Sequence, residues 1–309
     1  MHNLTELTGN ATSHTSLSVI IKVCVVIPFF CIFLCCIVVM LRIFATNRHF
    51  LDSSRYILFA YMLINDTLQL LSSVILFLLV MCLVTFPTVY CVPLLLLSTS
   101  TFMNTTLILA TMSLERYVAI IYPLQRPAAW RSDRIWIIIL SIWFLSFNFP
   151  MIEYSIGERD PAVDILSTPV LCKTVYINSS PIQAFFRAAV NILFFAVVSV
   201  VILFTYIKIL LKTRKMRQDK VSASKAKHTV LLHGFQLLLC MLAFTLPITE
   251  SIMAPHVSWS PEDITFFYYF CFILIPRFLS PLIYGFRDQT LRDRFGKTFL
   301  CCSNKANPV

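Results

Sequence analysis

Long uncharged runs alternate with short polar segments along almost the whole chain. Each run is close to the roughly 20 residues that an α-helix needs to cross the hydrocarbon core of a bilayer. Seven such runs predict seven membrane-spanning helices, at residues 19–44, 56–83, 92–114, 135–153, 185–208, 229–251 and 264–286. The pattern therefore predicts an all-α membrane protein, built as a single seven-helix bundle.

The composition agrees with this prediction. Of 309 residues, 58% are hydrophobic and 13% are charged, whereas soluble domains carry about 25% charged residues. No hydrophilic domain is visible at either end of the chain. We therefore expect one domain over residues 1–309, with an N-terminal segment at 1–18, the bundle at 19–286 and a tail at 287–309, and a spanning first helix that is not a cleaved signal.

Basic residues follow the first, third, fifth and seventh runs, including the segment at 208–228. Because Lys and Arg favour cytoplasmic loops, we expect a plasma-membrane protein with an extracellular N-terminus and a cytoplasmic C-terminus. The net charge of +10 is then a topology signal and an attraction to anionic membrane lipids. Its confinement to membrane-flanking segments argues against nucleic acid as a partner.

Residues on the predicted outer side carry signs of an extracellular environment. Sequons at Asn3, Asn10 and Asn178 would be glycosylated there. Cys91 and Cys172 also face this oxidising side, so a disulfide between them is expected. Cys82, near the outer end of the second run, is the alternative partner.

Ionisable residues inside the runs are the first candidates for function, because a charge in the bilayer is costly. Asp66 is either functional or a protonated structural residue. Arg187 and Glu250 either pair with each other, or Arg187 receives an anionic ligand such as a carboxylate. Arg277, a weaker candidate for ligand contact, is expected to pair with Asp66 or with a backbone carbonyl.

A Glu-Arg-Tyr sequence at the inner end of the third run introduces a set of motifs, one for most helices. In these motifs the chain resembles the rhodopsin-type G-protein-coupled receptors. The matching residues are Asp66, Glu115-Arg116-Tyr117, Trp143, Tyr206, Pro247 and Ser280-Pro281-Leu-Ile-Tyr284. The resemblance covers nearly the whole chain and implies a receptor that couples to a heterotrimeric G protein.

Within that family the chain is most similar to odorant receptors, especially those of fishes and amphibians. The similar stretches are 114–124, 229–240 and 276–288. Some family features are missing: an Asn in the first helix, a Pro in the fifth and an aromatic residue before Pro247. The extra outer-loop cysteines of mammalian odorant receptors are also absent. The resemblance implies a small odorant-like ligand and an olfactory-type stimulatory G protein.

The resemblance also implies roles for the switch residues. Arg116 would pair with Glu115 at rest and swing toward the G protein on activation. Tyr206 and Tyr284 would meet near Arg116, and Pro247 and Pro281 would kink their helices. The alternatives are an ordinary Arg at a helix end and tyrosines of an interfacial belt.

For Asp66 the resemblance implies a cluster of water or weakly bound sodium with Thr105 and Ser280. Ser280 stands where relatives have an amide, which weakens the expected sodium site. The resemblance also favours the disulfide between Cys91 and Cys172. No other metal and no cofactor is expected.

The ligand site is expected between the outer halves of the third, fifth, sixth and seventh helices. Ser98, Thr101, Phe102 and Thr105 share one face of the third helix, which either lines a pocket or packs against neighbours. Ser98 and Leu274 stand where amine receptors and opsins carry their acid and retinal lysine, which disfavours those ligands. The predicted ligand contacts are Ser98, Thr101, Phe102, Thr105, Arg187, Asn191, Glu250 and Phe270.

The tail is predicted to form a short amphipathic eighth helix on the inner leaflet, with Phe286, Leu291, Phe295 and Phe299 on one face. Cys301 and Cys302 follow it as candidates for palmitoylation. The resulting hypothesis is a G-protein-coupled odorant receptor without enzymatic activity. The alternatives are a receptor for a lipid, peptide or metabolite and, remotely, a transporter or channel.

Overall fold

The structure is a computed structural model that describes residues 2–47, 50, 52–122, 127–157, 169–177, 180–215, 235, 238 and 261–279. Its long helices are α1 (His2–Thr46), α2 (Ser54–Met81), α3 (Thr88–Ile121), α4 (Ile135–Ile156) and α6 (Pro181–Lys215). Helix α9 (Pro261–Tyr268) runs into the π-helical segment η3 (Tyr269–Leu274), and the helix continues through 275–279. Shorter elements are η2 (Ala128–Trp130), α5 (Thr174–Ile177) and the strands β1 (Thr85–Pro87) and β2 (Pro169–Leu171).

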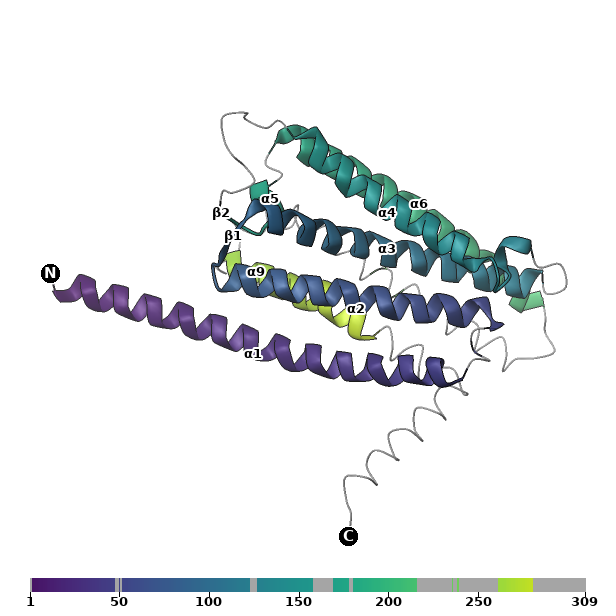
Figure 1. The fold of residues 1–309 in the computed structure, drawn as a ribbon, viewed down its shortest axis with the longest axis horizontal. Helices are drawn as coiled ribbons and strands as arrows, with labels where there is room; N and C mark the ends of the chain where they lie inside the picture. The colour runs from purple at the N-terminus through teal and green to yellow at the C-terminus, as the bar shows by residue number, and fades with distance from the viewer. Residues whose placement is uncertain are drawn as a thin grey trace, which may run out of the picture.

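The long helices lie side by side, and α3 is the central one (Figure 1). It packs against α2, α4 and α6, whereas α1 packs against α2. The described part of the seventh predicted span lies beside α2 and α1, with the Phe29 and Phe270 rings 5.3 Å apart. This arrangement places α2, α3 and the seventh span around a shared interior.

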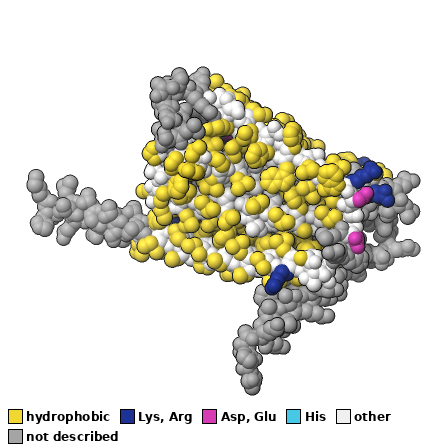
Figure 2. Space-filling model, viewed as in Figure 1, with side chains coloured by type: hydrophobic (Ala, Val, Ile, Leu, Met, Phe, Trp, Pro, Cys, Tyr) yellow, Lys and Arg dark blue, Asp and Glu magenta, His cyan; other side chains and the backbone are white. Residues whose placement is uncertain are grey.

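Five of the described helices are long and apolar enough to cross a membrane. Hydrophobic side chains cover most of the face shown in Figure 2, and Phe144 and Phe185 are 70% and 76% exposed. Several polar side chains, by contrast, are completely buried between helices, including Asn65, Asp66 and Asn104. This distribution suits a lipid surround, where apolar surface gains nothing by leaving lipid and polar groups find partners inside the bundle.

Six of the seven predicted spans match described helices in order, with different ends, whereas the sixth, 229–251, lies outside the described residues apart from 235 and 238. Helix α1 begins at His2, well before the predicted start at residue 19, so Asn3 and Asn10 lie within its first turns. Helix α3 includes Glu115 and Arg116 and ends at Ile121, with Tyr122 as its C-cap. Because the helical conformation is disfavoured for a residue that precedes a proline, the Tyr122-Pro123 sequence accounts for the end of α3 at Ile121.

One end of the bundle is held by a disulfide and a small sheet. Cys91, in the first turn of α3, is bonded to Cys172, which directly follows β2. Strands β1 and β2 pair antiparallel, with Phe86 opposite Val170. The predicted disulfide is confirmed, and Cys82 is a free, exposed cysteine. Together the two links hold residues 169–172 against the start of α3.

Candidate functional site

Polar side chains from α2 and α3 meet in the middle of the bundle. On α2, Asn65, Asp66 and Gln69 are at most 1% exposed. Thr101 and Thr105, four residues apart on α3, lie on the same helix face and are fully buried. With Arg277 from the seventh span, these residues form what we call the central network: Asn65, Asp66, Gln69, Thr101, Thr105 and Arg277.

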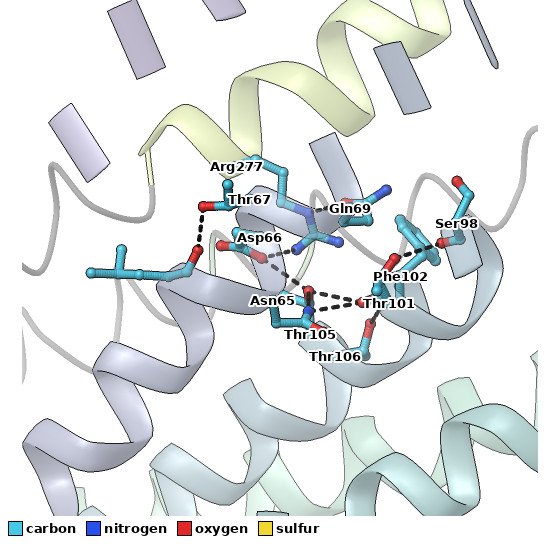
Figure 3. Close-up of polar contacts among 11 residues, drawn as sticks. Asn65, Asp66, Thr67, Gln69, Ser98, Thr101, Phe102, Thr105, Thr106 and Arg277 are labelled. Atoms are coloured by element: carbon cyan, nitrogen blue, oxygen red, sulfur yellow. Dashed lines mark hydrogen bonds and ion pairs between the residues drawn. The ribbon is translucent and has the colours of Figure 1, made fainter. Parts of the chain in front are cut away.

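Hydrogen bonds join the α2 and α3 sides of the central network (Figure 3). The Thr105 hydroxyl donates to Asp66 Oδ1 at 2.9 Å. Asn65 Nδ2 donates to Thr105 Oγ1 at 2.7 Å and to the Thr101 carbonyl at 3.0 Å. These bonds let a carboxylate and an amide lie inside the bundle, where unsatisfied polar groups are costly.

Arg277 brings a positive charge into this network from the seventh span. Its Nη1 lies 3.5 Å from Asp66 Oδ1, and its Nε donates to Gln69 Oε1 at 2.7 Å. Its Cζ lies 5.4 Å from the centre of the Phe102 ring, a distance typical of a cation–π contact. The Arg277 and Asp66 side chains are 1% and 0% exposed. Asp66, one of the two partners predicted for Arg277, is therefore the partner seen in the structure.

The predicted ligand residues of α3 divide between two roles. Thr101 and Thr105 pack against α2 inside the central network, which corresponds to the packing alternative for this face. The Thr101 hydroxyl donates to the Leu97 and Ser98 carbonyls. Phe102 lies against Arg277 instead. The network thus contacts the face of α3 for which the sequence left pocket lining and helix packing as alternatives.

A second, partly buried ion pair joins α4 to α6. Arg187 Nε donates to Glu153 Oε1 at 2.7 Å, and the two side chains are 21% and 9% exposed. Gln183 donates to the backbone carbonyl of Glu153 at 3.0 Å. We call Glu153 and Arg187 the α4–α6 pair. Glu250, the partner considered from the sequence, lies outside the described residues.

Sequence reasoning missed Glu153, although a signal was present. The fourth predicted span, 135–153, is uncharged except for this glutamate at its end. An acid at the end of an apolar run requires a partner, and Arg187 is a basic residue near the start of the next span, 185–208. Two other predicted ligand contacts lie outside α3 and outside both ion pairs. Asn191 is half-buried on α6, and the Phe270 ring stacks on the Phe266 ring at 5.9 Å.

At the opposite end of α3, the Glu115 carboxylate is buried and contacts α2. Ser54 Oγ donates to Glu115 Oε1 at 3.3 Å. The Tyr117 ring lies 5.5 Å from that of Phe204 on α6, and Tyr206 is half-buried on the same helix. Sequence reasoning missed Ser54, because a serine at the start of a helix is usually interpreted as part of a cap. The switching role of Arg116 stays a prediction.

Several predicted positions lie outside the described residues. They are Asn178, Pro247, Glu250, Ser280, Pro281, Tyr284, Cys301, Cys302 and the amphipathic helix after Tyr284. Ser280 was expected to join the cluster around Asp66, so that part of the prediction also lies outside the described residues. These assignments stay predictions.

Comparison with known proteins gives the family. The sequence model of the family of seven-transmembrane receptors of the rhodopsin type matches residues 37–284 of this chain. The chain belongs to this family. The seven-helix fold predicted from the apolar runs is thereby confirmed, and this receptor family is not enzymatic.

Two relatives illustrate the range of the family. Odorant receptor 131-2 of Danio rerio is 29% identical over 182 residues, which cover 59% of this chain and 56% of that receptor. Proteinase-activated receptor 1 of Xenopus laevis is 23% identical over 208 residues, which cover 65% of this chain and 48% of that receptor. The chain spans about half the length of the curated relatives it matches.

Proposed function

We propose that this receptor binds a small odorant-like ligand from the extracellular side of the plasma membrane and activates a stimulatory, olfactory-type heterotrimeric G protein. The observation that carries the proposal is the central network, which joins the α3 face of the candidate ligand residues to α2 and the seventh span. The similarity to an odorant receptor supports the class of ligand.

Activation is a shift between two arrangements of the same helices. A ligand that contacts the active arrangement better than the resting one shifts the equilibrium by that difference in binding free energy. Phe102 and Arg116 are both on α3, about 21 Å apart at 1.5 Å per residue. A movement of α3 at Phe102 therefore reaches the G-protein side through one continuous helix.

The α4–α6 pair bears on the chemistry of the ligand. Arg187 was the candidate for binding an anionic ligand, and its Nε already donates to the Glu153 carboxylate. An acidic ligand would have to compete with that carboxylate. We therefore place neutral odorants before carboxylic acids in the order of candidate ligands.

The test is a cyclic AMP assay in cells that express the receptor with an olfactory-type stimulatory G protein. A panel of volatile and water-soluble odorants is applied to the wild type and to Arg116→Ala. The proposal predicts a ligand-dependent rise that the substitution abolishes at equal surface abundance. If no compound of the panel raises cyclic AMP while the receptor is at the surface, the odorant assignment or the choice of G protein is wrong.

A receptor with a different kind of ligand is the second candidate, because a proteinase-activated receptor is among the relatives. Proteinases, lipids and peptides applied to the same cells separate the two. A response to these compounds without any response to odorants would favour the second candidate.

A further inference from the structure

The central network contains an ion pair between two helices. Buried ions need both a counter-charge and hydrogen bonds that satisfy their remaining groups. Asp66 receives the Thr105 hydroxyl together with the guanidinium of Arg277. Arg277 in turn donates to Gln69 and lies near the Phe102 ring. A cation supplied by the chain itself therefore neutralises the carboxylate.

The π-helical segment η3 accounts for the direction in which Arg277 points. A π turn contains an extra residue relative to an α turn, and each residue of an α-helix rotates the chain by about 100°. Arg277 follows η3 closely, so the extra residue sets which face of the seventh span carries it. Tyr269, at the start of η3, stacks on Phe77 at 4.8 Å and lies 3.3 Å from the Ser73 hydroxyl. Both contacts fix the segment against α2.

We propose that Arg277 is a built-in counter-ion of Asp66, in the place where a dissociable monovalent cation would otherwise bind, and that the pair holds the seventh span against α2 and α3 in the resting receptor. A guanidinium beside the carboxylate repels a second cation, because like charges at a few ångströms interact strongly in a medium of low dielectric constant. The stability of the wild-type receptor is therefore independent of sodium.

Phe102 gives this pair a connection to the ligand, a step that rests on the proposed function. The Phe102 ring contacts the guanidinium from α3, and Phe102 is also one of the candidate ligand contacts. A ligand that moves this ring weakens the cation–π contact of Arg277. The seventh span is then less firmly held against α2, which favours the active arrangement.

Sodium dependence of thermal unfolding provides the first test. The full-length receptor is purified in detergent, and its Tm is measured in sodium chloride and in choline chloride at equal ionic strength. We expect the same Tm for the wild type in both salts. In Arg277→Ser the Asp66 carboxylate has lost its counter-ion and sodium takes that place, so sodium raises the Tm by about 2–4 °C. The rise disappears when Asp66→Asn is added.

Two outcomes would overturn the proposal. One is a wild-type Tm that is higher in sodium and loses this dependence in Asp66→Asn, because a dissociable cation would then occupy the site. The other is an Arg277→Ser receptor whose Tm is the same in both salts, because removal of the guanidinium would then have opened no cation site.

Surface abundance in cells keeps the proposal testable if the single variants fold poorly. Arg277→Gln and Asp66→Asn each leave one buried ion without its counter-charge, so each lowers surface abundance several-fold. The double variant contains neither ion and recovers most of the loss. A double variant no better than the worse single variant would contradict the counter-ion role.

The ion pair between Lys22 and Asp263 is the matched control, since it also joins the seventh span to another helix. Its Nζ–Oδ1 distance is 2.6 Å, but the Asp263 side chain is 44% exposed. Water therefore solvates Asp263 when Lys22 is replaced, and Lys22→Gln changes surface abundance little. An equal loss in both pairs would show that any ion pair of this span has the same effect, against the proposal.

Signalling provides a third readout, separate from the first two. The double variant Asp66→Asn, Arg277→Gln is expected to show higher ligand-independent cyclic AMP per surface receptor than the wild type. Unchanged basal signalling with restored surface abundance would overturn the resting-state role. If no odorant activates the wild type, the proposed ligand class fails, whereas the sodium and abundance experiments still decide the role of Arg277.

Discussion

Two arginine–carboxylate pairs among the described residues differ in depth and in the number of helices they join. Asp66 and Arg277 are at most 1% exposed and connect α2, α3 and the seventh span. Glu153 and Arg187 are 9% and 21% exposed and connect α4 to α6. Because the cost of an unpaired ion grows with its distance from water, the same pair of side-chain types has a larger structural effect at the centre of the bundle.

The largest effect is expected for Arg277→Met, which keeps most of the side-chain volume and removes the charge. Asp66 then stays buried without its counter-ion, which costs about 3–5 kcal/mol. Thermal unfolding of the purified receptor measures the loss. A destabilisation smaller than that of Arg187→Met would contradict the dependence on depth.

Removal of the disulfide compares a covalent link with the ionic ones. Cys91→Ser, which separates α3 from the segment after β2, is expected to cost on the order of 2–4 kcal/mol. Cys82→Ser is the matched control, because Cys82 is exposed and free. Thermal unfolding and surface abundance are the measurements, and equal effects of the two substitutions would show that the link contributes nothing.

A smaller effect is expected at the α4–α6 pair. Arg187→Met leaves Glu153 near the end of α4, where partial exposure allows water to solvate the carboxylate, so we expect a loss of about 1–2 kcal/mol. The same variant tests whether neutral odorants come before carboxylic acids as ligands. If responses to acidic odorants disappear while those to neutral odorants persist at equal surface abundance, Arg187 binds anionic ligands directly.

The smallest effect is expected at the Glu115 end of α3. Ser54→Ala removes the hydroxyl that donates to Glu115 Oε1 and should cost about 0.5–1.5 kcal/mol. Because this contact holds α3 to α2 beside Arg116, we also expect a modest rise in basal cyclic AMP. Ser53→Ala is the control, since Ser53 caps α2 without a side-chain hydrogen bond. A rise of equal size in both variants would exclude a role for this contact.

Much of the fold was predictable, because the apolar runs and prolines determine it locally. The lengths of the runs gave the order of the described helices, whereas the helix ends differ from the predicted bounds, as at α3, which ends at Ile121. The disulfide was predictable because Cys91 and Cys172 both fall on the predicted outer side. The strands β1 and β2 were not, since three-residue strands carry no periodic signal.

The partners within the site were harder to predict. Asp66 was foreseen as a partner of Arg277, because buried charges need counter-charges. Gln69, Ser54 and Glu153 were not foreseen, since their contacts depend on how each helix is rotated about its axis. The π turn at η3 changes that rotation for Arg277, and no sequence pattern in the seventh run indicates such a turn.

The most direct test of the account is a pair of double-mutant cycles followed by thermal unfolding, one for Asp66 and Arg277 and one for Glu153 and Arg187. Each cycle compares Asn or Gln replacements, singly and together, with the wild type. We predict a coupling in the upper part of the usual range of about 0.5–3 kcal/mol for the central pair, and a clearly smaller coupling for the α4–α6 pair. Equal couplings, or a larger one between α4 and α6, would contradict the claim that the central pair holds the resting bundle together.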